Sequence, residues 1–97
     1  MASRAPLDEP ALATFCQTHA GWTHEDGALV KSYRFADYGA AVGFTMRVAL
    51  AAEKADHHPE IGLGWGRVRV AWSTHDAGGI TALDVAMAER TDSLANG

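Results

Sequence analysis

Titratable side chains gather in two short stretches of this chain of 97 residues. The first, residues 53–60, contains the adjacent histidines His57 and His58, and the second, residues 73–76, contains His75. The carboxylates close to these histidines in the sequence are Glu53, Asp56, Glu60 and Asp76, with Asp84 following shortly after. Because histidine titrates near neutral pH, such a cluster can transfer protons, bind a metal ion or lie in solvated turns.

Three interpretations of the histidine cluster follow from these residue types. In general acid–base catalysis, one histidine is a protonated acid and another a neutral base, while Glu53, Asp56 and Asp84 orient the rings. In a metal site, histidine with aspartate or glutamate suits zinc or non-haem iron, but the chain has no HExxH or comparable spacing. In the third, the histidines are solvated turn residues. Spacing alone leaves all three open, whereas covalent catalysis is disfavoured because no serine or cysteine stands in a recognisable nucleophile motif.

The composition indicates one small globular domain spanning residues 1–97. Hydrophobic residues make up 47% of the chain, and the formal net charge of -4 argues against nucleic acid as a partner. The single cysteine, Cys16, excludes an internal disulfide framework and a thiolate metal cluster. The first six residues lack the apolar segment of a signal peptide, and the longest apolar run, residues 40–52, is too short to cross a bilayer. We therefore expect a cytoplasmic protein with no membrane segment.

Local signals divide the chain into helices and strands that could position this cluster. Gly21 ends a first helical pattern, and Asp26–Gly27 between two short runs predicts a hairpin. Asp37 is placed to cap a long second helix, and Thr81 with Asp84 resembles the capping box of a third. The predicted elements are a helix over 10–20, hairpin strands over 22–25 and 28–35, a helix over 38–55, a strand over 65–73 and a final helix after Thr81.

Hydrophobic spacing predicts which faces pack the core. The strand over 65–73 alternates cleanly, and its buried face is predicted to carry Val68, Val70 and Trp72. In the helix over 38–55, the predicted core stripe is Val42, Met46, Ala49 and Glu53, with a flanking row of Phe44, Val48 and Ala51. The apolar face of the last helix is predicted to carry Leu83, Ala86, Met87 and Leu94. The glycine-containing stretch 60–66 reads as a turn-rich connection that contains at most a short strand.

The order of these elements predicts an α+β fold with the pattern α-β-β-α-β-β-α, in which the fifth element is short. Hairpins imply an antiparallel sheet, and helices with one apolar stripe imply that they cover one face of it.

The ordered set of motif residues resembles the pterin-4a-carbinolamine dehydratase family, whose activity is that of a 4a-hydroxytetrahydrobiopterin dehydratase. The resemblance rests on Glu53-x-x-x-His57-His58-Pro59, an aromatic residue at Trp65, Ser73-Thr74-His75, Gly79-Ile80-Thr81 and Asp84. It extends upstream through Gly21-Trp22 and the segment 43–49, and covers about residues 12–92. A double histidine alone is a weak signal, whereas this ordered set is specific.

The resemblance implies a four-stranded antiparallel sheet with three helices packed on one face. It implies homodimers formed by sheet extension, and homotetramers in some members. The reaction implied is loss of water from 4a-hydroxytetrahydrobiopterin to give quinonoid dihydropterin, with no cofactor and no metal. This activity would support tetrahydropterin recycling for an aromatic amino acid hydroxylase, in bacteria phenylalanine hydroxylase. The alternative is a non-catalytic oligomerisation or assembly module built on the same fold.

The resemblance also implies roles for individual residues. The catalytic set is His57, His58 and His75, with His57 and His75 as the acid and the base in an order that the sequence does not decide. The implied substrate-binding residues are Glu53, Pro59, Trp65, Ser73, Thr74 and Asp84, of which Asp84 would orient a histidine. The chain departs from the family at residues 61–66, where it lacks the usual tryptophan after Glu60 and the asparagine before the aromatic position. This departure bears on the preferred pterin side chain.

Overall fold

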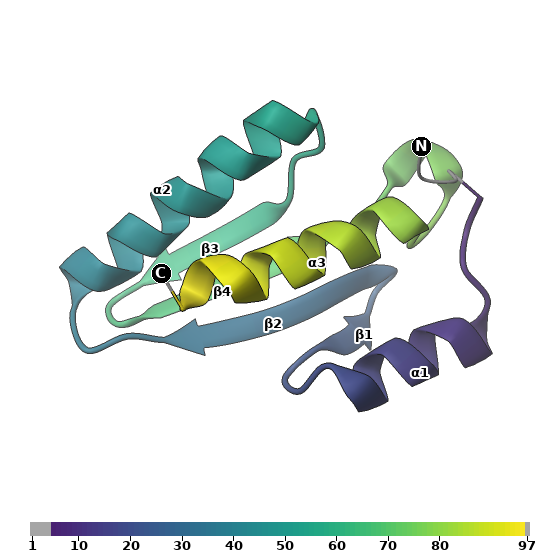
Figure 1. Ribbon diagram of the computed structural model, residues 1–97, viewed down its shortest axis with the longest axis horizontal. Coiled ribbons are helices and arrows are strands. Elements are labelled where there is room, and N and C mark those ends of the chain that lie inside the picture. Colours follow the sequence, from purple (N-terminus) through teal and green to yellow (C-terminus); the bar gives the residue numbers. More distant parts are fainter. Residues whose placement is uncertain (1–4, 97) are drawn as a thin grey trace.

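The computed structural model describes residues 5–96 as an α+β fold with an open, four-stranded antiparallel sheet. The strands lie in the order β1-β2-β4-β3, so β1 and β3 form the edges. Figure 1 shows α3 crossing the sheet, with α2 beside it on the β3 side and α1 beside it on the β1 side. The elements are α1 (Glu9–Thr18), β1 (Thr23–Glu25), β2 (Ala28–Arg34), α2 (Tyr38–Ala55), β3 (Glu60–Gly64), β4 (Arg67–Trp72), the 3-10 helix η1 (His75–Ala77) and α3 (Ala82–Ala95). The predicted fold class and element order are confirmed.

The interior strand β4 contributes one of its faces to the hydrophobic core. Its side chains Val68, Val70 and Trp72 are fully buried, whereas Arg67 and Arg69 are exposed on the opposite face. The alternation in the sequence predicted this arrangement correctly, because a strand directs successive side chains to opposite faces. β4 pairs with β2 on one side and with β3 on the other, so neither of its edges is open.

The predicted core stripe of α2 is wrong. The buried face consists of Ala41, Phe44, Val48 and Ala52, so it includes two members of the predicted flanking row and none of the predicted stripe. Met46 and Leu50 are more than half exposed, and Glu53 faces solvent with them. Because apolar residues surround this helix almost completely, periodicity could not separate the two faces. The bulky Phe44 and Val48 fill the space over the sheet instead. In α3, Ala86 is exposed and Ala88 and Thr91 are buried, so its predicted face is wrong at that position.

The short strand expected within the stretch 60–66 is present and takes up most of it, so the predicted turn-rich connection was too long. Residues Glu60–Gly64 form β3 and pair with β4 in an unbroken antiparallel register, from Glu60 with Ala71 to Gly64 with Arg67. The turn is confined to Trp65 and Gly66. Gly66 has φ +64°, and an added Cβ there would lie 3.0 Å from the Phe35 carbonyl oxygen. Pairing with β4 supplies the hydrogen bonds that hold the glycine-rich segment in an extended conformation.

A carboxylate on α3 links this helix to the β1–β2 hairpin. Asp92 accepts hydrogen bonds from Trp22 Nε1 at 3.0 Å, from Lys31 Nζ at 2.7 Å and from the Tyr33 hydroxyl. Burial alone would raise the pKa of Asp92, but the hydrogen bonds from Lys31, Tyr33 and Trp22, with the charge of Lys31, outweigh it and lower the pKa below its usual value. The pKa of Tyr33 is raised above its usual value, first by burial and then by the hydrogen bond to Asp92 and the negative charge of that carboxylate.

Across residues 5–96, no helix is both long and apolar enough to span a membrane.

Asp92 is expected to make stability depend on acidic pH. Its pKa is lower in the folded than in the unfolded chain, so the ionised carboxylate stabilises the fold above the unfolded value of about 3.9, and this stabilisation is lost as the pH falls through the folded value. The Asp92→Asn variant should therefore be less stable near neutral pH and lose less stability between about pH 6 and pH 3. Urea unfolding at several pH values measures this. Asp26→Asn, in an exposed turn, is the control for loss of one charge, and equal pH slopes for Asp92→Asn and wild type would contradict the assignment.

Candidate active site

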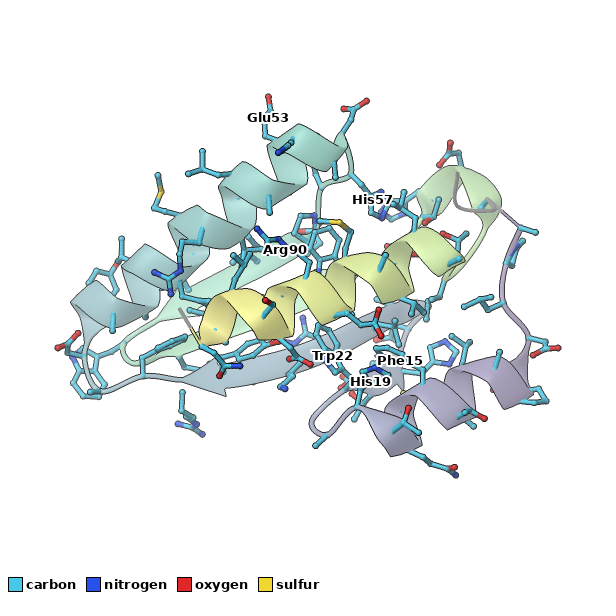
Figure 2. The ribbon with its side chains drawn as sticks, in the orientation of Figure 1. Phe15, His19, Trp22, Glu53, His57 and Arg90 are labelled. Atoms are coloured by element: carbon cyan, nitrogen blue, oxygen red, sulfur yellow. The ribbon has the colours of Figure 1, made fainter. Side chains whose placement is uncertain are left out.

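His57 stands where α2 ends and the chain turns toward β3. Asp56, the residue that caps α2, adopts a left-handed conformation with φ 54°, and this turns the backbone out of the helix. The His57 amide still donates to the Ala52 carbonyl oxygen at 3.1 Å, which fixes the start of the connection. Figure 2 shows His57 between the end of α2 and the segment that precedes α3. Its position is therefore set by backbone geometry before any side-chain contact.

Two further contacts fix the His57 ring. Its Nε2 lies 2.6 Å from Asp84 Oδ1, and the ring stacks on Trp72 with centroids 5.6 Å apart and an angle of 21° between the planes. The His57 side chain is only 11% exposed. A ring held by a carboxylate at one edge and an indole at one face has few alternative orientations.

Asp84 is fully buried, and donors occupy both of its carboxylate oxygens. Besides His57 at Oδ1, the Thr74 hydroxyl lies 2.7 Å and the Thr81 amide 2.9 Å from Oδ2. The Thr81 contact belongs to the capping box that begins α3, so one side chain caps the helix and contacts the histidine. Since a carboxylate only accepts hydrogen bonds, His57 Nε2 must carry a proton. Nδ1 is then the ring nitrogen left to exchange a proton with a bound molecule.

An open cavity of about 320 Å³ adjoins these residues. It is lined by Asp56, His57, His58, Ser73, Thr74, His75 and Asp76. The cavity thus lies between the end of α2, the end of β4 and η1, which carries His75 with an exposed side chain. A second hollow of about 270 Å³ shares the lining residues 73–75 and extends to Asp26 and Gly27 in the β1–β2 turn. The structure therefore brings together the three histidines from the two stretches of the sequence.

Four residues of the predicted site lie outside the lining of this cavity, and one of them is the buried carboxylate Asp84 described above. Glu53 is 80% exposed and pairs with His58 Nε2 at 2.9 Å on the surface of α2's last turn. Pro59 is partly buried immediately before β3. Trp65 occupies the β3–β4 turn and is 76% exposed, at the far end of a strand that spans roughly 13 Å. Within one copy of the chain, Trp65 is thus remote from the histidines.

Sequence reasoning missed one contribution to the site. Trp72 was placed in the core by alternation, but its role as the surface under the His57 ring had no sequence signal. The predicted capping box of Thr81 and Asp84 is confirmed, and its bond from the Thr81 amide also holds the Asp84 carboxylate. Asp76, which lines the cavity, belonged to the predicted cluster without an assigned role.

The geometry suits proton transfer. One histidine is enclosed and oriented by a buried carboxylate, and a second lies across an open cavity on an exposed loop. Histidines in such different environments can divide the roles of acid and base. Among the side chains of residues 5–96, no group of three or more His, Cys, Asp and Glu is arranged to hold a metal ion.

Comparison with known proteins finds relatives that match nearly the whole chain. The family model described as pterin 4 alpha carbinolamine dehydratase matches residues 5–94. A protein of Rhizorhabdus wittichii named "Putative pterin-4-alpha-carbinolamine dehydratase" is 46% identical over 92 residues, covering 93% of this chain and 95% of its own length.

Two solved structures share the fold. A structure titled as a transcriptional coactivator/pterin dehydratase from Brucella melitensis has a TM-score of 0.87 and 37% identity, covering 93% of this chain and 98% of that one. A pterin dehydratase-like protein described as a RuBisCO assembly factor in the alpha-carboxysome has a TM-score of 0.68 and 26% identity, covering 79% and 92%. Relatives of this fold therefore carry two different functional descriptions.

The two histidine–carboxylate pairs should differ sharply in their effect on stability. In Asp84→Asn, the side-chain NH2 group is a donor that replaces an acceptor oxygen. It would point at another donor, because three donors surround the carboxylate in the wild-type protein. We expect a loss of about 2–4 kcal/mol in the free energy of unfolding. Glu53→Gln, at the exposed His58 pair, should change it by no more than about 0.5 kcal/mol. Chemical denaturation monitored by tryptophan fluorescence measures both, and equal losses would refute the structural role of Asp84.

Proposed function

The chain belongs to the pterin 4 alpha carbinolamine dehydratase family, and on this premise we propose that it is a hydro-lyase that dehydrates 4a-hydroxytetrahydrobiopterin to quinonoid dihydropterin. The observation that carries the proposal is the pairing of His57 with buried Asp84 beside a cavity that His75 also lines. The family match alone would support an inactive member equally well. A dehydratase needs a proton donor and a proton acceptor held in fixed positions, whereas a non-catalytic scaffold has no need of them.

The reaction requires one proton donor and one proton acceptor. The donor protonates the 4a-hydroxyl, and the C4a–O bond breaks with release of water as the N5 lone pair forms the N5=C4a bond. The resulting cation loses a ring proton to the acceptor, so one proton is given and one is taken. His57, through Nδ1, and His75 fill these two roles, and neither step changes the oxidation state of the ring.

The remaining site residues suit substrate binding. His58 lines the cavity and pairs with Glu53, so both can contact the polar edge of the pterin at the mouth. Ser73 and Thr74 line the cavity wall, and Ser73 is the one that would contact the ring edge, because the backbone amide and carbonyl of Thr74 already bond to Gly79. The carbinolamine substrate is a product of tetrahydropterin-dependent hydroxylation. An aromatic amino acid hydroxylase, phenylalanine hydroxylase in a bacterium, would therefore supply it in the cytoplasm.

Self-association would bring Trp65 to the site. β3 is an edge strand, and the side chains on and beside it include Leu63, Met46 and Leu50, which are more than one third exposed. We propose a homodimer in which two β3 strands pair antiparallel, the usual way to complete an exposed edge. In that arrangement, the Trp65 turn of one copy lies beside the Pro59 end of the other. Exposed Met46 and Leu50 on α2 would allow dimers to join as tetramers.

A non-catalytic assembly module is the second candidate function. It is favoured by the related fold described as a RuBisCO assembly factor and by the exposed apolar side chains of α2. Such a module would keep the surface but have no requirement for an oriented histidine pair.

Single replacement of His57 or His75 by alanine tests the acid–base assignment. Each variant should lower the rate of carbinolamine dehydration by roughly 10²–10⁴-fold, because each removes one proton-transfer group. The rate is followed by ultraviolet absorbance of the quinonoid product after chemical generation of the carbinolamine. His24→Ala, at an exposed position on β1, is the matched control and should keep the wild-type rate. Wild-type rates for both His57→Ala and His75→Ala would refute the assignment.

Disruption of the β3 edge tests the proposed homodimer. Leu63→Lys should shift the mass measured by light scattering toward that of one chain, 10.3 kDa, because a lysine on an edge strand opposes strand pairing. Thr23→Lys on the other edge strand, β1, is the control and should leave the mass unchanged. A wild-type protein that is monomeric at micromolar concentration would contradict the proposal.

A further inference from the structure

We propose that Thr74 is a positioning residue that couples the two catalytic histidines, with its side chain acting on His57 and its backbone acting on His75. This inference rests on the proposed function and deepens it, because it explains how residues from separate segments keep a fixed relation across the cavity. Thr74 is 2% exposed and lies between the end of β4 and η1.

The side chain of Thr74 completes a chain of hydrogen bonds that ends at His57. A threonine hydroxyl has one proton, and Thr74 directs it to Asp84 Oδ2 at 2.7 Å. The Thr81 hydroxyl lies 3.0 Å from the Thr74 oxygen, so Thr81 is the donor in that contact. Oδ2 is thereby occupied, and Oδ1 is left for His57 Nε2 at 2.6 Å. Together with the Thr81 amide, which also donates to Oδ2, Thr74 thus holds the carboxylate so that Oδ1 faces the protonated Nε2.

The backbone of Thr74 closes the loop that carries His75. Its amide donates to the Gly79 carbonyl oxygen at 3.1 Å, and its own carbonyl accepts from the Gly79 amide at 3.3 Å. The Ala77 amide also donates to the Thr74 carbonyl oxygen at 3.1 Å. Because His75 is the next residue along the chain, these bonds fix the base of the loop beside Asp84. A displacement of Thr74 would therefore move both histidines relative to each other.

Replacing Thr74 by valine or by serine distinguishes the effect of its hydroxyl group from the effects of its side-chain volume and its backbone. Thr74→Val keeps the shape and can keep the backbone bonds to Gly79, but removes the proton donated to Asp84. Thr74→Ser keeps the hydroxyl and loses one methyl group. Thr45→Val is the matched control, since the Thr45 hydroxyl bonds only to the Ala41 carbonyl oxygen within α2, at 2.9 Å, among the hydrogen bonds of the described chain.

The test combines kinetics with nitrogen-15 NMR of labelled histidine rings at a pH where the imidazole is neutral. In wild type, the His57 signals should show a protonated Nε2 and a bare Nδ1. Thr74→Val should lower kcat by roughly 10–100-fold with a smaller effect on KM, and should mix the two His57 tautomers. Thr74→Ser should restore both the tautomer and most of kcat. Thr45→Val should match wild type in both measurements.

Two outcomes would overturn the proposal: Thr74→Val with wild-type kcat and an unchanged His57 tautomer, or Thr74→Ser as impaired as Thr74→Val. If Thr74→Val does not fold, the wild-type spectrum still decides, because a His57 ring protonated at Nδ1 would contradict the hydrogen-bond chain. If the wild-type protein does not accelerate dehydration, the proposed function fails. The NMR comparison still tests the hydrogen bonds that run from Thr74 through Asp84 to His57.

Discussion

The buried carboxylate of Asp84 is the constraint on which the site depends. A carboxylate removed from water is costly unless hydrogen bonds replace its hydration. Here the donors come from His57 after α2, Thr74 after β4 and Thr81 at the start of α3. The Thr81 donor is local to α3, whereas His57 and Thr74 precede Asp84 by 27 and 10 residues, so the carboxylate is fully satisfied only when α2, β4 and α3 have docked. The contacts that stabilise this end of the fold also orient the candidate catalytic histidine.

The fold places the two halves of the site in contrasting environments. His57 rests on Trp72 in the core and is almost enclosed, whereas His75 projects from an exposed loop. The fold alone does not specify a reaction, because related structures are described both as a pterin dehydratase and as a RuBisCO assembly factor. The arrangement of His57, Asp84 and His75, rather than the fold, therefore supports the proposed dehydratase activity.

The fold class was predictable because several local signals were unambiguous, such as the alternation of β4 and the Asp26–Gly27 hairpin turn. The core face of α2 was not, since apolar residues occur all round that helix and only docking on the sheet distinguishes Phe44 from Met46. β3 was predicted only as a short element without bounds, because its glycines resemble a turn and its extended form depends on pairing with β4.

The candidate site was predictable as a set of residue types but not as a geometry. The sequence identified the histidines and Asp84, yet could not show that His57 pairs with Asp84 while His58 pairs with exposed Glu53. That division depends on the left-handed turn at Asp56 and on the position of Trp72 beneath the ring. The first is a local feature of the helix end and the second arises from tertiary packing, and residue spacing in the sequence specifies neither.

The central claim, that this chain is a dehydratase and not only an assembly module, is tested most directly with the wild-type protein alone. The carbinolamine is generated chemically, and the formation of quinonoid dihydropterin is followed with and without micromolar protein. Dehydratase function predicts a rate that rises in proportion to protein concentration above the uncatalysed rate. The same rate in the presence and absence of folded protein would contradict it.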